Sequence, residues 1–203
     1  MEDDNNKFEI VIDFGKGGNP NRVFRSMADL IDTFQDLDTT LAEVVGSQVN
    51  NTLILEDIEK GSLKTIIRNV IHDAPDEDLR DAKFKRILGF YLVKAKYAVL
   101  RWCEDTPKLI SPDQVSALDS ELVRIAEETN INQIPAYRAP DRVKLLTNIS
   151  SIQKSTRYLN EDDTVRYNCE SGSSKVTDAI EISDSIVEDI LTREVLDDRS
   201  EAI

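Results

Sequence analysis

Residues 7–46 read KFEIVIDFGKGGNPNRVFRSMADLIDTFQDLDTTLAEVVG, and this stretch predicts a β-strand followed by a loop and a long helix. Apolar residues alternate along Lys7–Phe14, which is typical of a strand with one buried face. Asn19 and Pro20 are typical of a helix start, because proline at the first helical position lacks only an N–H that would have no helical partner. Apolar residues then recur every three or four positions, so we expect a helix over residues 20–45.

The residues after this helix predict a β-hairpin. Leu53–Ile58 resembles a second strand, and the tetrapeptide Glu59-Lys60-Gly61-Ser62 has the composition of a tight turn. Residues 62–71 fit two patterns, because their apolar positions have helical spacing while many of them are β-branched. We predict a strand, since a hairpin here gives the long helix a three-stranded surface to cover.

Three more helices and a second hairpin are expected in the remaining sequence. The helices are predicted near residues 78–104, 112–128 and 141–157. Ser111–Gln114 has the pattern of a capping box at the start of the second of them. Residues 164–169 and 175–182 are expected to pair as the hairpin, before a short helix near 184–194. The predicted fold class is therefore α+β: a β-α-β-β layer packed with about three helices, then a small hairpin and a short helix.

Two unequal lobes are the expected domain organisation. Residues 1–128 would form an α+β lobe with a long central helix, and residues 141–203 a smaller lobe with a helix and a hairpin. The proline-containing segment 129–140, TNINQIPAYRAP, would connect them.

Charge and composition restrict the class of partner. The chain has 203 residues, 39 acids and 25 bases, and 40% hydrophobic residues, which is enough apolar material for a folded core. A net charge of −14 disfavours binding to nucleic acid. The acids gather at both ends of the sequence, and 13 of them lie in residues 161–203. These ends are interpreted as solvated surface, with mimicry of nucleic acid as the alternative.

The sequence predicts a cytoplasmic protein without a membrane span. The N-terminus, MEDDNNKFEI, does not have the pattern of a secretory leader, and Cys103 and Cys169 are expected to be free thiols. The longest apolar run contains Lys94 and Lys96 and is shorter than the roughly 20 residues that a spanning helix needs.

Catalytic motifs are weak in this sequence. His72 is the only histidine, and no G-x-S-x-G motif accompanies it. Two separated cysteines and one histidine do not have the paired spacing of a zinc site, so we expect no metal and no cofactor. Binding is therefore favoured over catalysis.

The glycine-rich loop after the first strand suggests an alternative function. A strand, a glycine loop and a helix N-terminus form a geometry that can hold phosphate. The loop matches neither common nucleotide-binding pattern, and a simple turn into the helix is favoured. The alternative anion-binding residues are Lys16, Gly17, Gly18, Arg22 and Arg25.

The helix near residues 78–104 is apolar on two faces. One broad face has the pattern of an ordinary core face, and the other carries aromatic and aliphatic residues between two basic borders. Lys94 and Arg101 lie on one border, and Lys96 lies on the other. Burial on both sides within the fold is the simpler interpretation, and binding to a partner protein or a second copy is the alternative. The candidate partner-binding residues are Phe90, Val93, Tyr97, Leu100, Lys94 and Arg101. Seven bases and one acid lie between Arg80 and Arg101, so contact with nucleic acid or a membrane headgroup is a third interpretation.

The β-α-β-β opening with its Glu59-Lys60-Gly61-Ser62 turn resembles the start of uncharacterised bacterial proteins from defence and mobile-element loci. The resemblance covers the first third of the chain. It implies a bacterial protein from a defence or mobile-element locus and assigns no role to any residue. We expect a non-enzymatic interaction or assembly subunit of a bacterial intracellular complex. The alternatives are a phosphate- or nucleotide-binding protein and an acidic mimic of nucleic acid.

Overall fold

A computed structural model describes residues 6–15, 19–46, 51–59, 63–71, 82–129, 131, 137–176, 180–182, 186 and 189–190. Its centre is an antiparallel sheet of five strands in the order β2-β3-β1-β5-β6. These strands are β1 (Lys7–Asp13), β2 (Asn51–Glu59), β3 (Leu63–Ile71), β5 (Thr164–Cys169) and β6 (Gly172–Lys175). A short parallel pair is formed by β4 (Lys108–Leu109) and β7 (Glu181–Ile182). The predicted α+β class is confirmed.

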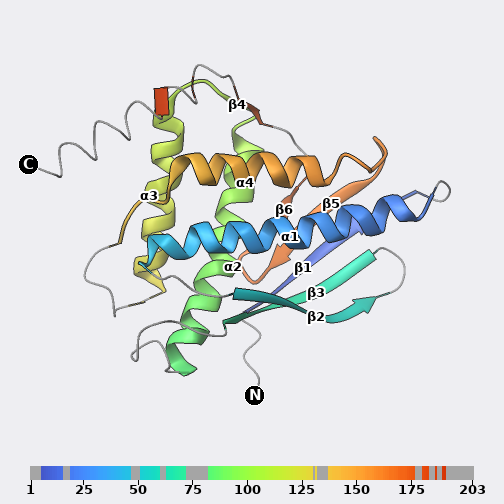
Figure 1. The fold of residues 1–203 in the computed structure, drawn as a ribbon, viewed down its shortest axis with the longest axis horizontal. Coiled ribbons are helices and arrows are strands. Elements are labelled where there is room, and N and C mark those ends of the chain that lie inside the picture. Colours follow the sequence, from blue (N-terminus) through green and yellow to red (C-terminus); the bar gives the residue numbers. More distant parts are fainter. Residues whose placement is uncertain are drawn as a thin grey trace, which may run out of the picture.

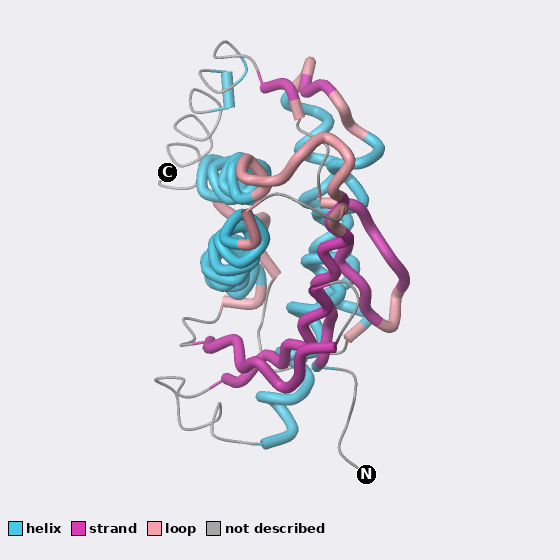
Figure 2. The backbone as a smooth tube through the Cα atoms, turned by 90° about the vertical axis from the view of Figure 1, so that its right-hand side faces the viewer, coloured by secondary structure: helices cyan, strands magenta, loops and turns pink. Residues whose placement is uncertain are grey.

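Four long helices pack with this sheet. They are α1 (Asn21–Val44), α2 (Ala82–Asp105), α3 (Pro112–Glu128) and α4 (Arg142–Ser155). Helices α1 and α4 lie side by side and cross α2, which runs next to α3 (Figure 1). In Figure 2 α1 and α4 are seen nearly end-on, to one side of the curved sheet. Among the helices in the described residues, none is long and apolar enough to cross a membrane.

Aromatic side chains join the sheet to α1 in the core. The ring of Phe8 on β1 stacks on Tyr167 of β5, with ring centres 5.0 Å apart. The ring of Phe34 on α1 makes edge-to-face contacts with both, with ring centres 6.1 Å from Phe8 and 5.7 Å from Tyr167. All three side chains are fully buried, so this cluster fixes α1 against the two central strands.

Most of the predicted elements are found in the structure. Residues 63–71 form a strand, with every second residue buried, so the β-branched composition decided between strand and helix. The capping box of α3 is present, because Ser111 accepts from the Asp113 N–H and Gln114 Oε1 accepts from the Ser111 N–H. The predicted start of α2 and most of the predicted C-terminal helix lie outside the described residues.

The C-terminal hairpin differs from the prediction. Its second strand is Gly172–Lys175 instead of residues 175–182, and Glu181–Ile182 pairs with β4. The turn comes early because Gly172 has φ of 140°, a conformation that favours glycine. A Cβ atom at Gly172 would also lie 2.6 Å from the Tyr97 hydroxyl.

Strand β5 pairs with β1, with Ile10 opposite Tyr167. The sheet therefore contains strands from both of the predicted lobes. Much of the predicted 129–140 connection lies outside the described residues.

An ion pair is buried between α1 and α2. Lys96 was expected on a basic border of the central helix, but its side chain is fully buried and its ammonium contacts the Asp38 carboxylate. The same nitrogen donates to Asn69 Oδ1 at 3.3 Å and lies 4.8 Å from the centre of the Phe8 ring. Burial lowers the pKa of Lys96, and the nearby Asp38 opposes that shift.

Candidate functional site

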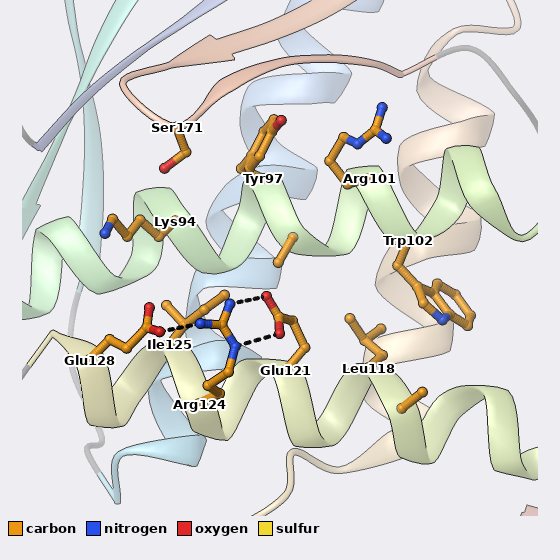
Figure 3. Close-up of a pocket in the computed structure, with 12 residues that line it drawn as sticks. Lys94, Tyr97, Arg101, Trp102, Leu118, Glu121, Arg124, Ile125, Glu128 and Ser171 are labelled. Atoms are coloured by element: carbon orange, nitrogen blue, oxygen red, sulfur yellow. Dashed lines mark hydrogen bonds and ion pairs between the residues drawn. The ribbon is translucent and has the colours of Figure 1, made fainter.

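A groove of about 420 Å³ lies between α2 and α3 (Figure 3). Helix α2 forms one wall, α3 forms the other, and the turn between β5 and β6 reaches the groove through Ser171. The lining residues are Lys94, Tyr97, Ala98, Arg101, Trp102, Ala117, Leu118, Glu121, Arg124, Ile125, Glu128 and Ser171. We call this feature the α2–α3 groove.

The floor of the groove is apolar because helical spacing brings small and apolar residues to facing positions. On α2, Ala98 and Trp102 are four residues apart, and on α3 Leu118 and Ile125 are seven apart, so each pair lies on one face of its helix. Leu118 and Ile125 are almost fully buried beneath the groove, whereas Ala98 and Trp102 are partly exposed in it. Trp102 is held in place because its indole N–H donates to the Gln114 carbonyl at 3.1 Å. The methyl side chain of Ala98 leaves space that a larger residue would fill.

Charged residues form the rim on both walls. Arg124 on α3 donates to both carboxylate oxygens of Glu121, at 2.5 and 2.8 Å, and also contacts Glu128. These two acids raise the pKa of Arg124 above its usual value. The three side chains are therefore a connected charged strip along one wall, as Figure 3 shows.

Lys94 and Arg101 are the basic side chains that α2 contributes to the rim. Arg101 is bound by Glu104 at 2.6 Å and by Asp105 at 3.5 Å, and these acids raise the pKa of Arg101. The ammonium of Lys94 lies 4.4 Å from the centre of the Phe90 ring, in a cation–π contact.

The structure divides the six predicted partner-binding residues between two environments. Lys94, Tyr97 and Arg101 line the α2–α3 groove, and Phe90 lies one turn before Lys94 and is partly exposed. Val93 and Leu100 are buried inside this chain.

The burial of Val93 and Leu100 has a clear cause, because the C-terminal hairpin packs on that side of α2. Tyr167 of β5 donates its hydroxyl to the Val93 carbonyl at 3.0 Å. Leu100 lines a small cavity together with Lys175 and Val176, at the end of β6. Neither side chain is on the surface that a partner would meet first.

Sequence reasoning missed the contribution of α3 to the groove. A helix over residues 112–128 was predicted from the sequence, but it was assigned no part in a binding surface. The spacing of Leu118, Glu121, Ile125 and Glu128 by three or four residues was the available signal for a second wall. Nothing in the sequence indicated that this wall would stand beside α2.

Two of the five predicted anion-binding residues, Arg22 and Arg25, lie in the described part of the chain, and both contact other residues of this chain. Lys16, Gly17 and Gly18 lie outside the described residues. The Arg22 side chain donates to the buried Asp163 carboxylate at 3.2 Å, and Arg25 lies 6.0 Å from the centre of the Tyr158 ring.

Asp163 is held by several donors at the start of β5. It accepts from the backbone N–H groups of Gly15 and Asn160 as well as from Arg22. Although burial opposes ionisation, these donors keep the pKa of Asp163 below its usual value. Arg22 therefore links α1 to the segment before β5.

Both cysteines are free thiols and are partly buried. Burial raises the pKa of Cys103 to about 12 and also raises the pKa of Cys169. The reactive form of cysteine is the thiolate, which such shifts disfavour. Within the part of the chain that the structure describes, no group of three or more histidine, cysteine or acidic residues is placed to hold a metal ion. His72 lies outside this part.

The outer face of the sheet alternates acids and bases. Glu56 on β2 contacts Lys7 and Arg68, and Lys64 pairs with Glu9 at 2.9 Å. Although desolvation opposes it, the contacts from Lys7 and Arg68 lower the pKa of Glu56. These acids are therefore locally neutralised by bases of the same sheet.

Comparison with protein-family models, with curated proteins and with solved structures finds no match to this chain.

Proposed function

We propose that this chain is a non-enzymatic subunit that binds a segment of a partner protein in the α2–α3 groove. The main observation that supports this proposal is an apolar floor between two packed helices, bordered by charged side chains. Aromatic and apolar anchor positions surrounded by a polar rim are typical of protein-binding surfaces. Tyr97 and Trp102 supply the aromatic positions, and Lys94, Arg101 and Arg124 supply cations at the rim.

The partner segment that fits the groove best is amphipathic. An aliphatic or aromatic side chain would fill the space above Ala98, next to Trp102. Arg101 and Arg124 already contact acids of this chain, whereas the Lys94 ammonium rests on the Phe90 ring. A carboxylate on the partner would therefore meet Lys94. Recognition of an amphipathic helix in a groove uses this combination of apolar anchors and rim charges.

Two further observations support binding over catalysis. The thiol groups of Cys103 and Cys169 have raised pKa values, and Arg22 of the predicted anion site is bound to Asp163. Following the resemblance of the first third of the chain, we propose that the partner belongs to a bacterial intracellular assembly with a defence role.

Photo-cross-linking from two adjacent positions tests the proposed site. Glu128 lines the groove, whereas the exposed neighbour Glu127 does not. A photo-reactive amino acid at position 128 is expected to capture one specific protein in the native host, because the occupant passes over this side chain. The same amino acid at position 127 points about 100° away around α3 and is expected to give little of that product.

The measurement is the yield of each cross-linked protein, identified by mass spectrometry, at equal amounts of folded variant. Equal yields at positions 127 and 128 would show that the capture is nonspecific and would remove the support for the groove.

A further inference from the structure

The two ends of the α2–α3 groove have different surroundings. Its long axis follows the two helices, with Lys94 and Glu128 at one end and Trp102 at the other (Figure 3). The lining residues of α3 run from Ala117 to Glu128, so the groove accompanies about three turns of this helix. The chain passes from α2 to α3 at the Trp102 end, and the connection between the helices is therefore the next surface along this axis.

An aliphatic side chain is exposed on that connection. Ile110 is 69% exposed, more than any other large hydrophobic side chain in the described residues. The residue before it, Leu109, belongs to β4 and is buried. An isoleucine left in water forgoes the hydrophobic free energy that burial against another apolar surface would supply. Ile110 is therefore suited to contact a partner that reaches this end of the groove.

Gln114 holds the Ile110 backbone in place next to Trp102. The Gln114 side-chain oxygen accepts from the backbone N–H of Ile110 at 2.8 Å and from that of Ser111 at 3.1 Å. Its amide nitrogen donates to the Lys108 carbonyl at 3.3 Å, and its backbone carbonyl accepts from the Trp102 indole N–H at 3.1 Å. One residue of α3 thus positions both the connection and the last aromatic ring of the groove. An apolar side chain on a backbone that is already fixed has less conformational entropy to lose on binding.

We propose that the partner segment in the α2–α3 groove is a helix of about 17 residues that continues past Trp102 and covers Ile110. This inference rests on the proposed function, and it adds the length of the bound segment and a residue that determines specificity. Helix α3 has 17 residues and is roughly 25 Å long, so a helix beside it that reaches from Glu128 to Ile110 has about the same length. A segment that filled the groove alone would need only about 12 residues.

The chemistry at the two ends fixes the direction of the bound segment. Residues 109–112 are uncharged, and the ammonium of Lys108 binds Glu181 on β7 at 3.1 Å. The partner therefore presents an aliphatic or aromatic side chain at Ile110 and a carboxylate at Lys94, at opposite ends of one helix. The reverse direction would bury that carboxylate against Ile110 without a cation, which is unfavourable. The groove is thus selective for the order of these two groups along the partner sequence.

Photo-cross-linking from position 110 tests the proposed length. A photo-reactive amino acid at this position is expected to capture the same protein as position 128. Mass spectrometry is expected to place the two cross-linked partner residues about 17 positions apart in its sequence. The control is position 108, because the Lys108 side chain is directed to Glu181 and a photo-reactive group there is expected to give little of this product.

Capture at position 128 without capture at position 110 would overturn the proposal and leave the groove function in place. Two cross-linked residues fewer than about ten positions apart would also overturn it, because a helix of that length ends within the groove. If position 128 gives no specific capture, the groove function fails, and this inference fails with it.

Two synthetic peptides measure the contact with Ile110 itself. The long peptide contains the whole partner segment between the two cross-links, and the short peptide lacks about five residues at the end that meets position 110. We expect the wild type to bind the long peptide about tenfold more tightly than the short one, and Ile110→Ser to bind both with the same Kd. The matched control Lys108→Ser is expected to keep the tenfold preference. A folded Ile110→Ser variant with the wild-type preference would overturn the assignment of Ile110.

Discussion

Lys96→Met is expected to lower the free energy of unfolding by about 3–5 kcal/mol, because it removes the ammonium that neutralises the buried Asp38 carboxylate. Both side chains are fully buried between α1 and α2, so water cannot replace the lost cation without opening the core. Asn69 also loses a donor, which adds to the cost. Urea denaturation followed by circular dichroism measures the change.

A double variant separates charge compensation from packing. Lys96→Met combined with Asp38→Leu replaces the ion pair with apolar side chains, and such replacements of buried pairs are often neutral or stabilising. We therefore expect the double variant to recover most of the lost free energy. A single Lys96→Met variant with wild-type stability would show that the ion pair is not buried as the structure has it.

Phe34→Ala is expected to destabilise the fold by about 3–5 kcal/mol, because it leaves a cavity among Phe8, Tyr167 and the neighbouring core. Phe34 is 0% exposed, and its ring contacts two strands of the sheet. The matched control is Phe24→Ala, in the same helix, where the side chain is 60% exposed. That change is expected to stay within about 0.5 kcal/mol of wild type.

Thermal and urea unfolding of the two phenylalanine variants can be compared directly, since both remove the same atoms from α1. Similar costs for the two substitutions would contradict the assignment of Phe34 to the core and Phe24 to the surface.

Local signals predicted much of the fold. The alternation in β1, the proline at the start of α1 and the capping box at Ser111 each involve residues within a few positions of one another. Such patterns are readable from a single sequence because the hydrogen bonds and the buried face follow from the element itself. The β-branched composition of residues 63–71 likewise indicated a strand correctly.

Contacts between distant residues were not predictable in the same way. Lys96 meets Asp38 and Asn69, 58 and 27 positions away, and its helical position alone placed it on a basic border without identifying the acid that it meets. The pairing of β5 with β1 covers the side of α2 that carries Val93 and Leu100. A helical pattern shows that two faces are apolar, but the identity of the covering element depends on the whole topology.

The sequence predicted only one wall of the candidate site, the wall that α2 forms. The apolar and basic pattern of α2 predicted Lys94, Tyr97 and Arg101 as site residues. Leu118 and Ile125 belong to the site only because α3 packs beside α2. A groove needs both walls, so its volume and its apolar floor are properties of the packed helices and not of either sequence segment.

The most direct test of the proposed groove function is the affinity of the partner that cross-links to position 128. Isothermal titration calorimetry would compare the wild type with Ala98→Glu, which places a charged side chain on the apolar floor, and with Ala28→Glu on the exposed face of α1. We predict a loss of about 2 kcal/mol, or roughly 30-fold in Kd, for Ala98→Glu and wild-type affinity for Ala28→Glu. A folded Ala98→Glu variant with wild-type affinity would contradict binding in the α2–α3 groove.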